Sequence, residues 1–254
     1  MPKTPPALDA SKAIRTASLA AAGVLFGELA YAVLRPAPPM EEFDPSGTFG
    51  DPRSRPLHIG VMGDSSCTGP GLSSVDETWV RQAARDIAEL GFHVQVSSVA
   101  VGGARVPHLL AEQLQPMLDL DPDVVLVSVG GNDALRGIRP SAFERDLTTL
   151  TEALVATGAL VMLSGVGDLG TIPRLLPPWS GLMRRRSVRF DEIHATVAER
   201  HGAVKADQWA VVPSVFSDPG IFSADLFHPG PAGHRQWADV AVAAISPHLR
   251  FESG

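Results

Sequence analysis

The sequence predicts an α/β protein, a three-layer α/β/α sandwich built around a roughly five-stranded parallel sheet. Short apolar runs rich in β-branched residues, such as DVVLVSV (123–129), are too continuous for a strand with one face in water. Segments with apolar residues at helical spacing lie between these runs. Buried strands that alternate with amphipathic helices are typical of a parallel sheet covered by helices on both faces.

The predicted strands and helices alternate along the chain from residue 57 onward. The strands are expected at 57–62, 93–99, 123–129, 159–166 and 203–206. The helices are expected at 76–90, 107–118, about 141–154, 181–200 and 231–245, with Ser141 as a cap and Glu144 as its capping-box partner. Because ligands of such sheets bind at the carboxyl ends of the strands, a site is expected in the loops that follow them.

The composition of the chain argues against several classes of function. The formal net charge is −7, whereas a nucleic-acid-binding domain is usually basic. The single cysteine, Cys67, excludes an intrachain disulfide, and the sequence contains no CxxC or HExxH motif for a metal. We therefore expect a single enzyme-sized domain with a tail, no nucleic-acid partner, and neither a metal nor an organic cofactor.

The N-terminal segment differs from the rest of the chain. Residues 17–34 form an apolar run whose one charge is Glu28, and such a helix would span roughly 27 Å, about the thickness of a bilayer core. Three interpretations stay open: a membrane anchor, a signal peptide with Ala30-Tyr31-Ala32 as its cleavage site, or a helix packed on the soluble domain.

The segments around this run suggest a domain organisation. Basic residues precede the run and acidic residues follow it, so an anchor would leave the N-terminus in the cytoplasm and the main domain outside. Residues 1–35 would form the hydrophobic helix, residues 36–56, rich in proline and acids, a linker, and residues 57–254 the main domain. The protein would then be anchored in the membrane or exported to the cell envelope, and a soluble cytoplasmic form stays open.

Four polar segments fall where the carboxyl edge of the sheet is expected. They are GDSSCTG (63–69), VGGA (101–104), GGND (130–133) and DLFHP (225–229). Each segment alone is a common turn pattern, because glycine, asparagine, aspartate and serine favour turns. Their convergence on one edge of the sheet is what indicates a site.

These segments contain the groups that acyl transfer needs. A serine hydroxyl such as that of Ser65 needs an adjacent base, and His228 can take its proton and return it later. Asp225, three residues before His228, can orient the imidazole and stabilise its charged form. The backbone N–H groups of Ser65 and Gly103 and the side-chain amide of Asn132 suit the oxyanion of a tetrahedral intermediate.

The four segments resemble four blocks of the SGNH (GDSL-type) hydrolases, over roughly residues 57–247. The resemblance implies the flavodoxin-like fold of that family and a serine esterase or lipase. Ser65 maps to its nucleophile, His228 to its base, Asp225 to the aspartate that orients the histidine, and Gly103 and Asn132, with the Ser65 amide, to its oxyanion hole. Two departures, Ser97-Ser98 in the second block and Ser66-Cys67 in the first, leave the substrate preference open.

The function predicted from the sequence is hydrolysis of carboxylic esters through an acyl-enzyme on Ser65. Short- to medium-chain acyl esters, acetyl esters and lipid esters all fit, and the membrane is a further partner if residues 17–34 contact it. One alternative is a membrane-anchored scaffold without activity. The other is a nucleotide-binding module, because GVGDLG (165–170) matches GxGxxG, although a loop rather than a helix is expected after it.

A proline-rich apolar segment, TIPRLLPPWSGL (171–182), is expected beside the site. We expect it to form a wall that meets the acyl chain, with Leu175, Leu176 and Trp179 as the substrate-binding residues. Fold and catalytic groups alone do not choose among ester substrates.

Overall fold

The computed structural model describes residues 40–210 and 219–249, together with Ser18, Gly23 and Gly27. These residues contain a six-stranded sheet in the order β1-β3-β2-β4-β5-β6. Its strands are β1 (Gly47–Phe49), β2 (Arg55–Gly63), β3 (Phe92–Ser98), β4 (Val124–Ser128), β5 (Leu160–Leu163) and β6 (Val204–Lys205). All neighbours are parallel except β1, which pairs antiparallel with β3. The predicted parallel sheet of five strands is confirmed, and one antiparallel strand is added at its edge.

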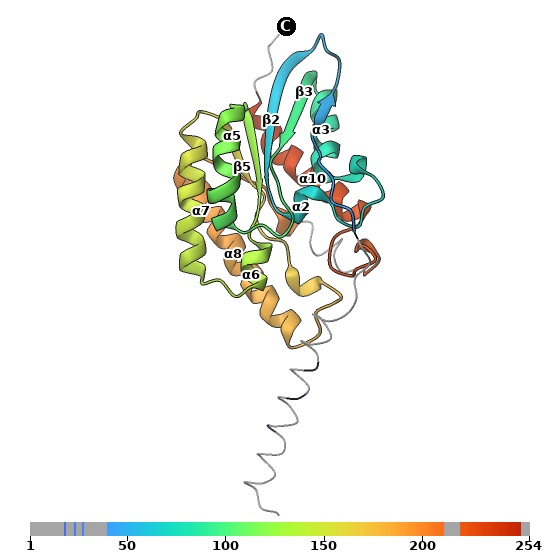
Figure 1. The fold of residues 1–254 in the computed structure, drawn as a ribbon, viewed down its shortest axis with the longest axis vertical. Coiled ribbons are helices and arrows are strands. Elements are labelled where there is room, and N and C mark those ends of the chain that lie inside the picture. The colour runs from blue at the N-terminus through green and yellow to red at the C-terminus, as the bar shows by residue number, and fades with distance from the viewer. Residues whose placement is uncertain (1–17, 19–22, 24–26, 28–39, 211–218, 250–254) are drawn as a thin grey trace, which may run out of the picture.

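Helices cover both faces of this sheet and complete the predicted sandwich (Figure 1). On one face α3 (Trp79–Glu89) and α10 (Pro231–Ile245) enclose a core with Ile59 and Leu126. On the other face α5 (Leu114–Leu120), α7 (Pro140–Val155) and α8 (Trp179–His201) enclose a second core with Val125 and Val127. Neighbouring residues of β4 thus enter different cores, as the alternation of side chains along a strand requires.

The predicted helix at 107–118 is built from three pieces. It consists of α4 (Val106–His108), a π-helical stretch (Leu109–Gln113) and α5. The extra backbone width of a π turn often marks a functional position, and here it presents Gln113 to the end of β2. The Gln113 amide accepts from the Gly63 N–H and donates to the Gly63 carbonyl, both at 2.9 Å. Gln113 therefore satisfies the backbone just before the first polar loop.

The start of α7 differs from the expected cap. Arg139 is the residue before the helix, no side chain caps it, and Pro140 occupies the first helical position. Proline is favoured there because its φ is already helical and its missing N–H would have no partner. The prediction that Ser141 caps this helix is therefore wrong.

The segment expected to be a linker is largely part of the fold. β1 lies within residues 36–56 and pairs with β3, and β2 already begins at Arg55. The Ser46 hydroxyl accepts from the Ser98 N–H at 3.0 Å, which ties the strand start to the sheet. The linker prediction is thus wrong for the described part of that range, because backbone hydrogen bonds to an open sheet edge outweigh its proline-rich composition.

The predicted membrane span at 17–34 lies outside the described residues apart from Ser18, Gly23 and Gly27. Among the residues that the structure describes, no helix has the length and apolar character needed to cross a bilayer. The three interpretations of this segment stay predictions.

Candidate active site

Ser65 lies at the start of a short helix that directly follows β2. This helix, α2 (Ser65–Thr68), is capped by Asp64, whose Oδ1 accepts from the Ser66 N–H at 2.9 Å. It ends at Gly69, which adopts a left-handed conformation with φ 61°. The Trp79 indole donates to the Ser66 carbonyl at 2.9 Å, so α3 braces the helix from the side. The turn therefore presents Ser65 at the carboxyl edge of the sheet.

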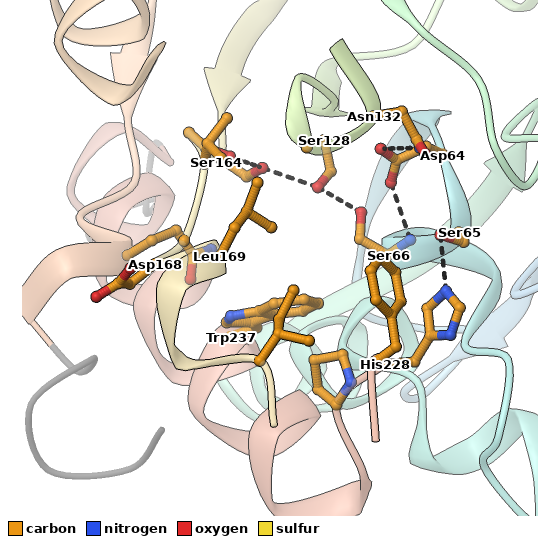
Figure 2. Close-up of a pocket in the computed structure, with 18 of the residues that line it drawn as sticks. Asp64, Ser65, Ser66, Ser128, Asn132, Ser164, Asp168, Leu169, His228 and Trp237 are labelled. Carbon is orange, nitrogen blue, oxygen red and sulfur yellow. Dashed lines mark hydrogen bonds between the residues drawn. The ribbon is translucent and has the colours of Figure 1, made fainter. Parts of the chain in front are cut away.

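The structure brings Ser65, His228 and Asp225 into one hydrogen-bonded chain. His228 Nε2 lies 3.2 Å from Ser65 Oγ, a contact that Figure 2 shows, and His228 Nδ1 lies 2.7 Å from Asp225 Oδ2. Ser65 and His228 are 163 residues apart in the sequence, so only the fold creates this contact. A serine, an imidazole and a carboxylate in this order can activate the hydroxyl as a nucleophile.

The Asp225 carboxylate is held by more than its histidine. Its Oδ1 accepts from Ser223 Oγ at 2.7 Å and from the N–H groups of Phe227 and His228 at 2.9 and 3.0 Å. Although burial alone would raise the pKa of Asp225, these bonds and the His228 contact hold the pKa below its usual range. The carboxylate is therefore charged and fixed.

The turn between Asp225 and His228 is strained. Leu226 has φ 58°, a left-handed conformation that costs a residue with a side chain roughly 1–2 kcal/mol. The Leu226 N–H bonds to the Ser223 carbonyl at 2.9 Å, which closes the turn. This conformation folds the chain so that the Phe227 and His228 N–H groups reach Asp225 Oδ1 while the His228 ring reaches Asp225 Oδ2, a feature that the spacing alone did not reveal.

The predicted oxyanion donors differ in their partners. The Asn132 Nδ2 atom donates to Asp64 Oδ2 at 3.1 Å and to the Ala104 carbonyl at 3.2 Å. Asn132 thereby links the Ser65 turn to the loop that contains Gly103, whose φ is 73° and whose surface is exposed. An oxyanion at this place would compete with Asp64 and Ala104 for the Asn132 amide.

Glu42 supports the same loop and was not predicted. Its Oε2 accepts from the Gly102 N–H at 3.1 Å and from Thr68 Oγ1 at 3.3 Å. One side chain thus connects the end of α2 to the loop that contains Gly103. The sequence offered no signal for this role, because Glu42 lies in the segment interpreted as a linker.

Two buried aspartates accompany the site. Burial raises the pKa of Asp64, against hydrogen bonds from Ser66 and Asn132 that favour the charged form. Burial also raises the pKa of Asp133 to about 6. Asp133 Oδ2 accepts from the Val106 N–H at 3.4 Å and so braces the start of α4.

A cavity of about 130 Å³ opens beside Ser65 and His228. It is lined by residues from every predicted polar segment except 101–104, and by Leu169, Thr171 and Ile172 of the loop that follows β5. Leu175, Leu176 and Trp179 are not in this lining, and Leu176 is 44% exposed. The expected wall therefore consists of the start of the segment 171–182 and not of these three residues, because the chain turns away from the cavity before α8 begins.

The GxGxxG pattern at 165–170 does not open an α-helix. It runs from the loop after β5 into a three-residue 3₁₀ turn, Leu169–Thr171, and α8 begins only at Trp179. The helix N-terminus that would bind a pyrophosphate is thus missing at this place. Over residues 40–210 and 219–249, no group of three or more metal-binding side chains lies close enough to hold an ion.

Other reactive side chains near the site are buried in structural roles. Burial raises the pKa of the Cys67 thiol, which leaves it in its neutral form. His234, 1% exposed, accepts the Trp79 N–H through Nδ1 at 3.2 Å. Cys67 lies within α2 and His234 bonds the first residue of α3, and neither residue lines the cavity.

Comparison with known proteins agrees with this arrangement. Residues 61–236 match the profile of the GDSL-like Lipase/Acylhydrolase family. A GDSL-like esterase of Mycobacterium tuberculosis is 29% identical over 205 residues, which cover 76% of this chain and 63% of that protein, slightly under two thirds of its length. Esterase TesA of Pseudomonas aeruginosa is 29% identical over 201 residues, which cover 74% of this chain and 88% of the relative.

A similar fold occurs among solved structures. The crystal structure of TesA superposes with a TM-score of 0.65 at 25% identity, and the match covers 76% of this chain and 99% of that structure. The family match begins at residue 61, near the end of β2, so it covers β3, β4, β5 and β6 but neither β1 nor the first six residues of β2. The sequence match and the fold match thus point to the same set of proteins.

Proposed function

This chain belongs to the GDSL-like lipase/acylhydrolase family and is a carboxylic ester hydrolase, and we propose that it works through an acyl-enzyme on Ser65. The observation that carries this proposal is the chain of contacts from Ser65 Oγ to His228 Nε2 at 3.2 Å and from His228 Nδ1 to Asp225 Oδ2 at 2.7 Å. Both ring nitrogens of His228 are thereby used, one toward the nucleophile and one toward the carboxylate.

In the first half of the reaction, Ser65 Oγ attacks the ester carbonyl carbon. The new C–O bond forms as the hydroxyl proton moves to His228 Nε2, and the carbonyl oxygen becomes an oxyanion. The charged Asp225 stabilises the imidazolium that results. The bond to the alcohol oxygen then breaks, and His228 gives its proton to the leaving alcohol.

In the second half, water takes the place of the alcohol. His228 removes a proton from the water, whose oxygen attacks the acyl carbon, and the proton then returns to Ser65 Oγ as the carboxylic acid leaves. The oxyanion forms again, and we propose that the N–H groups of Ser65 and Gly103 and the Asn132 amide hold it. Typically the loss of one such donor slows turnover by about 100- to 1,000-fold.

We propose short- to medium-chain acyl or acetyl esters as substrates. The cavity of about 130 Å³ supports this range, since an apolar cavity of similar size, about 150 Å³, holds a benzene ring. The relatives named above are described as esterases.

A p-nitrophenyl ester series from acetate to palmitate tests the proposal. The chain from residue 40 onward should hydrolyse the short members fastest, and Ser65→Ala should lose nearly all of this activity. A matched control is Ser73→Ala, an exposed serine whose hydroxyl bonds Glu77 away from the cavity. Equal activity of wild type and Ser65→Ala would mean that Ser65 is not the nucleophile, and an inactive wild type would favour a scaffold role.

A further inference from the structure

A row of polar side chains crosses the cavity wall beside the nucleophile. Ser66, Ser128, Ser164 and Gln208 all line the cavity. They stand at the carboxyl ends of β2, β4, β5 and β6, which are consecutive neighbours in the sheet. Because neighbouring strands lie about 4.8 Å apart, the ends of these four strands span roughly 14 Å along the edge of the sheet.

The three hydroxyls of this row are joined to one another, as Figure 2 shows. Ser164 Oγ donates to Ser128 Oγ at 2.9 Å, and Ser128 Oγ lies 2.6 Å from Ser66 Oγ. These two contacts use two of the three hydroxyl protons. The Ser66 hydroxyl also bonds the Asp64 carboxylate, so the capacity that is left lies in the hydroxyl oxygens, among them Ser164 Oγ, which donates to Ser128. The row therefore keeps hydrogen-bonding capacity for a ligand.

Gln208 ends the row with an acceptor that has no donor. Its side chain is 6% exposed, and its buried Oε1 atom has no hydrogen-bond partner. Buried polar atoms are almost always paired, and an unpaired one calls for an explanation such as a missing ligand or water. Gln208 lines the cavity, and a rotation of its amide would bring this atom to a donor on a bound molecule.

Apolar side chains also line the cavity. They include Leu169, Ile172, Phe222, Phe227 and Trp237. Figure 2 shows the Trp237 ring across the cavity from the row of serines. The cavity thus offers hydrogen bonds together with carbon and aromatic surface, which suits a molecule that has both hydroxyl and C–H groups.

We propose that this cavity binds a hydroxylated portion of the ester substrate, with its hydroxyl groups along Ser66, Ser128, Ser164 and Gln208. The proposal rests on the esterase function proposed above and names the substrate class of that site, an ester of a small polyol or sugar or of a hydroxylated acid. A plain alkyl group in the same place would leave Gln208 Oε1 without a donor. Sites built to bond a hydroxyl discriminate strongly against analogues that lack it.

Two matched pairs of esters test the proposal and distinguish the two sides of the ester bond. Glyceryl monobutyrate and propyl butyrate have the same acyl group and a three-carbon alcohol, and they differ only by two hydroxyls. The p-nitrophenyl esters of 3-hydroxybutyrate and butyrate place the hydroxyl on the acyl side instead. We expect the hydroxylated member of one pair to have a kcat/KM at least about tenfold higher.

Two variants assign the preference to the row. Gln208→Met keeps the length of the side chain but removes its acceptor, and Ser164→Ala removes one hydroxyl of the row. In both variants the ratio of kcat/KM between hydroxylated and plain ester should fall toward one. Gln95→Met, at an exposed position on β3 outside the cavity, is the control and should keep the wild-type ratio.

The outcomes separate this proposal from the one before it. Equal kcat/KM within both pairs for an enzyme that needs Ser65 would overturn the hydroxylated substrate and leave the esterase function standing. A wild-type preference that survives in both row variants would also overturn it, provided that thermal melting shows them folded. Hydrolysis that does not depend on Ser65 would instead remove the proposed function itself.

Discussion

Two histidines six residues apart in the C-terminal part of the chain have opposite environments. His228 keeps 19% of its side chain exposed at the cavity and contacts Ser65 and Asp225 through its two ring nitrogens. His234 is 1% exposed in α10, accepts the Trp79 N–H, and stacks edge-on against Trp237 with ring centroids 5.4 Å apart. The same side chain therefore faces the reaction in one place and packs in the core in the other.

The difference between them is electrostatic. A carboxylate with a lowered pKa lies beside His228 and can stabilise a positive imidazolium. Burial lowers the pKa of His234 to about 3, so this ring stays neutral at all ordinary pH values. Only a histidine that can gain and lose a proton serves as a general base. The carboxylate beside His228 therefore distinguishes it from His234, although both histidines lie near the active site.

The largest expected effect is on the exposed histidine. His228→Ala should lower kcat on p-nitrophenyl butyrate by roughly 10⁶-fold, because Ser65 would lose its base. His234→Asn, which keeps an acceptor for the Trp79 N–H, is the matched change and should alter kcat by no more than about threefold. Comparable losses of kcat in the two variants would contradict the different roles of His228 and His234.

The next largest effect is expected for Asp225, the carboxylate that contacts His228. Asp225→Asn should lower kcat by about 10⁴-fold, since an amide can stabilise neither the needed tautomer nor the imidazolium. Steady-state kinetics on the same ester measures it. The control is Asp239→Asn, an exposed aspartate of α10 that pairs with Arg235, for which wild-type turnover is expected. Near-normal turnover by Asp225→Asn would show that His228 works without a charged partner.

The smallest effect is on stability and its dependence on pH. The pKa of His234 is about 3 in the folded protein against 6.5 for an unperturbed histidine. Between these pH values the unfolded state binds a proton that the folded state does not bind. The contribution of neutral His234 to the free energy of unfolding is therefore fully present above pH 6.5 and decreases as the pH falls. His234→Asn should reduce that slope by up to about 1.4 kcal/mol per pH unit between pH 6 and 4.

Urea unfolding followed by circular dichroism at several pH values measures this slope. His248→Asn, at an exposed position after α10, is the control and should leave the slope as in the wild type. An unchanged slope in His234→Asn would contradict the burial of a neutral histidine at this position.

Much of the sheet and of the site was predictable from the sequence. The strand at 123–129 is predictable from its continuous apolar run, because a buried parallel strand needs apolar residues on both faces. The positions of Ser65, Asp225 and His228 were predictable because they follow strands or share one turn, so that sheet topology brings them to one edge. The helix α10 was predicted with both its ends, since Pro231 starts it after a glycine.

The parts that escaped prediction depend on contacts between distant segments. Glu42 reaches Gly102 across 60 residues, and Gln113 reaches Gly63 across 50, without any local pattern that marks them. The cavity wall was misplaced onto Leu175, Leu176 and Trp179 for the same reason, because composition shows that a segment is apolar but not where it turns. Gln208 had no signal in the sequence, since one glutamine after a two-residue strand resembles any surface residue.

The central claim, that Ser65 is the activated nucleophile of this site, is tested most directly by covalent labelling. Diethyl p-nitrophenyl phosphate should release one equivalent of p-nitrophenol per chain, and peptide mass mapping should place the diethylphosphoryl group on Ser65. Ser65→Ala should take no label, whereas Ser66→Ala should still be labelled on Ser65. A label on Ser66 or Cys67 in the wild type, or persistence of stoichiometric labelling in Ser65→Ala, would contradict the account.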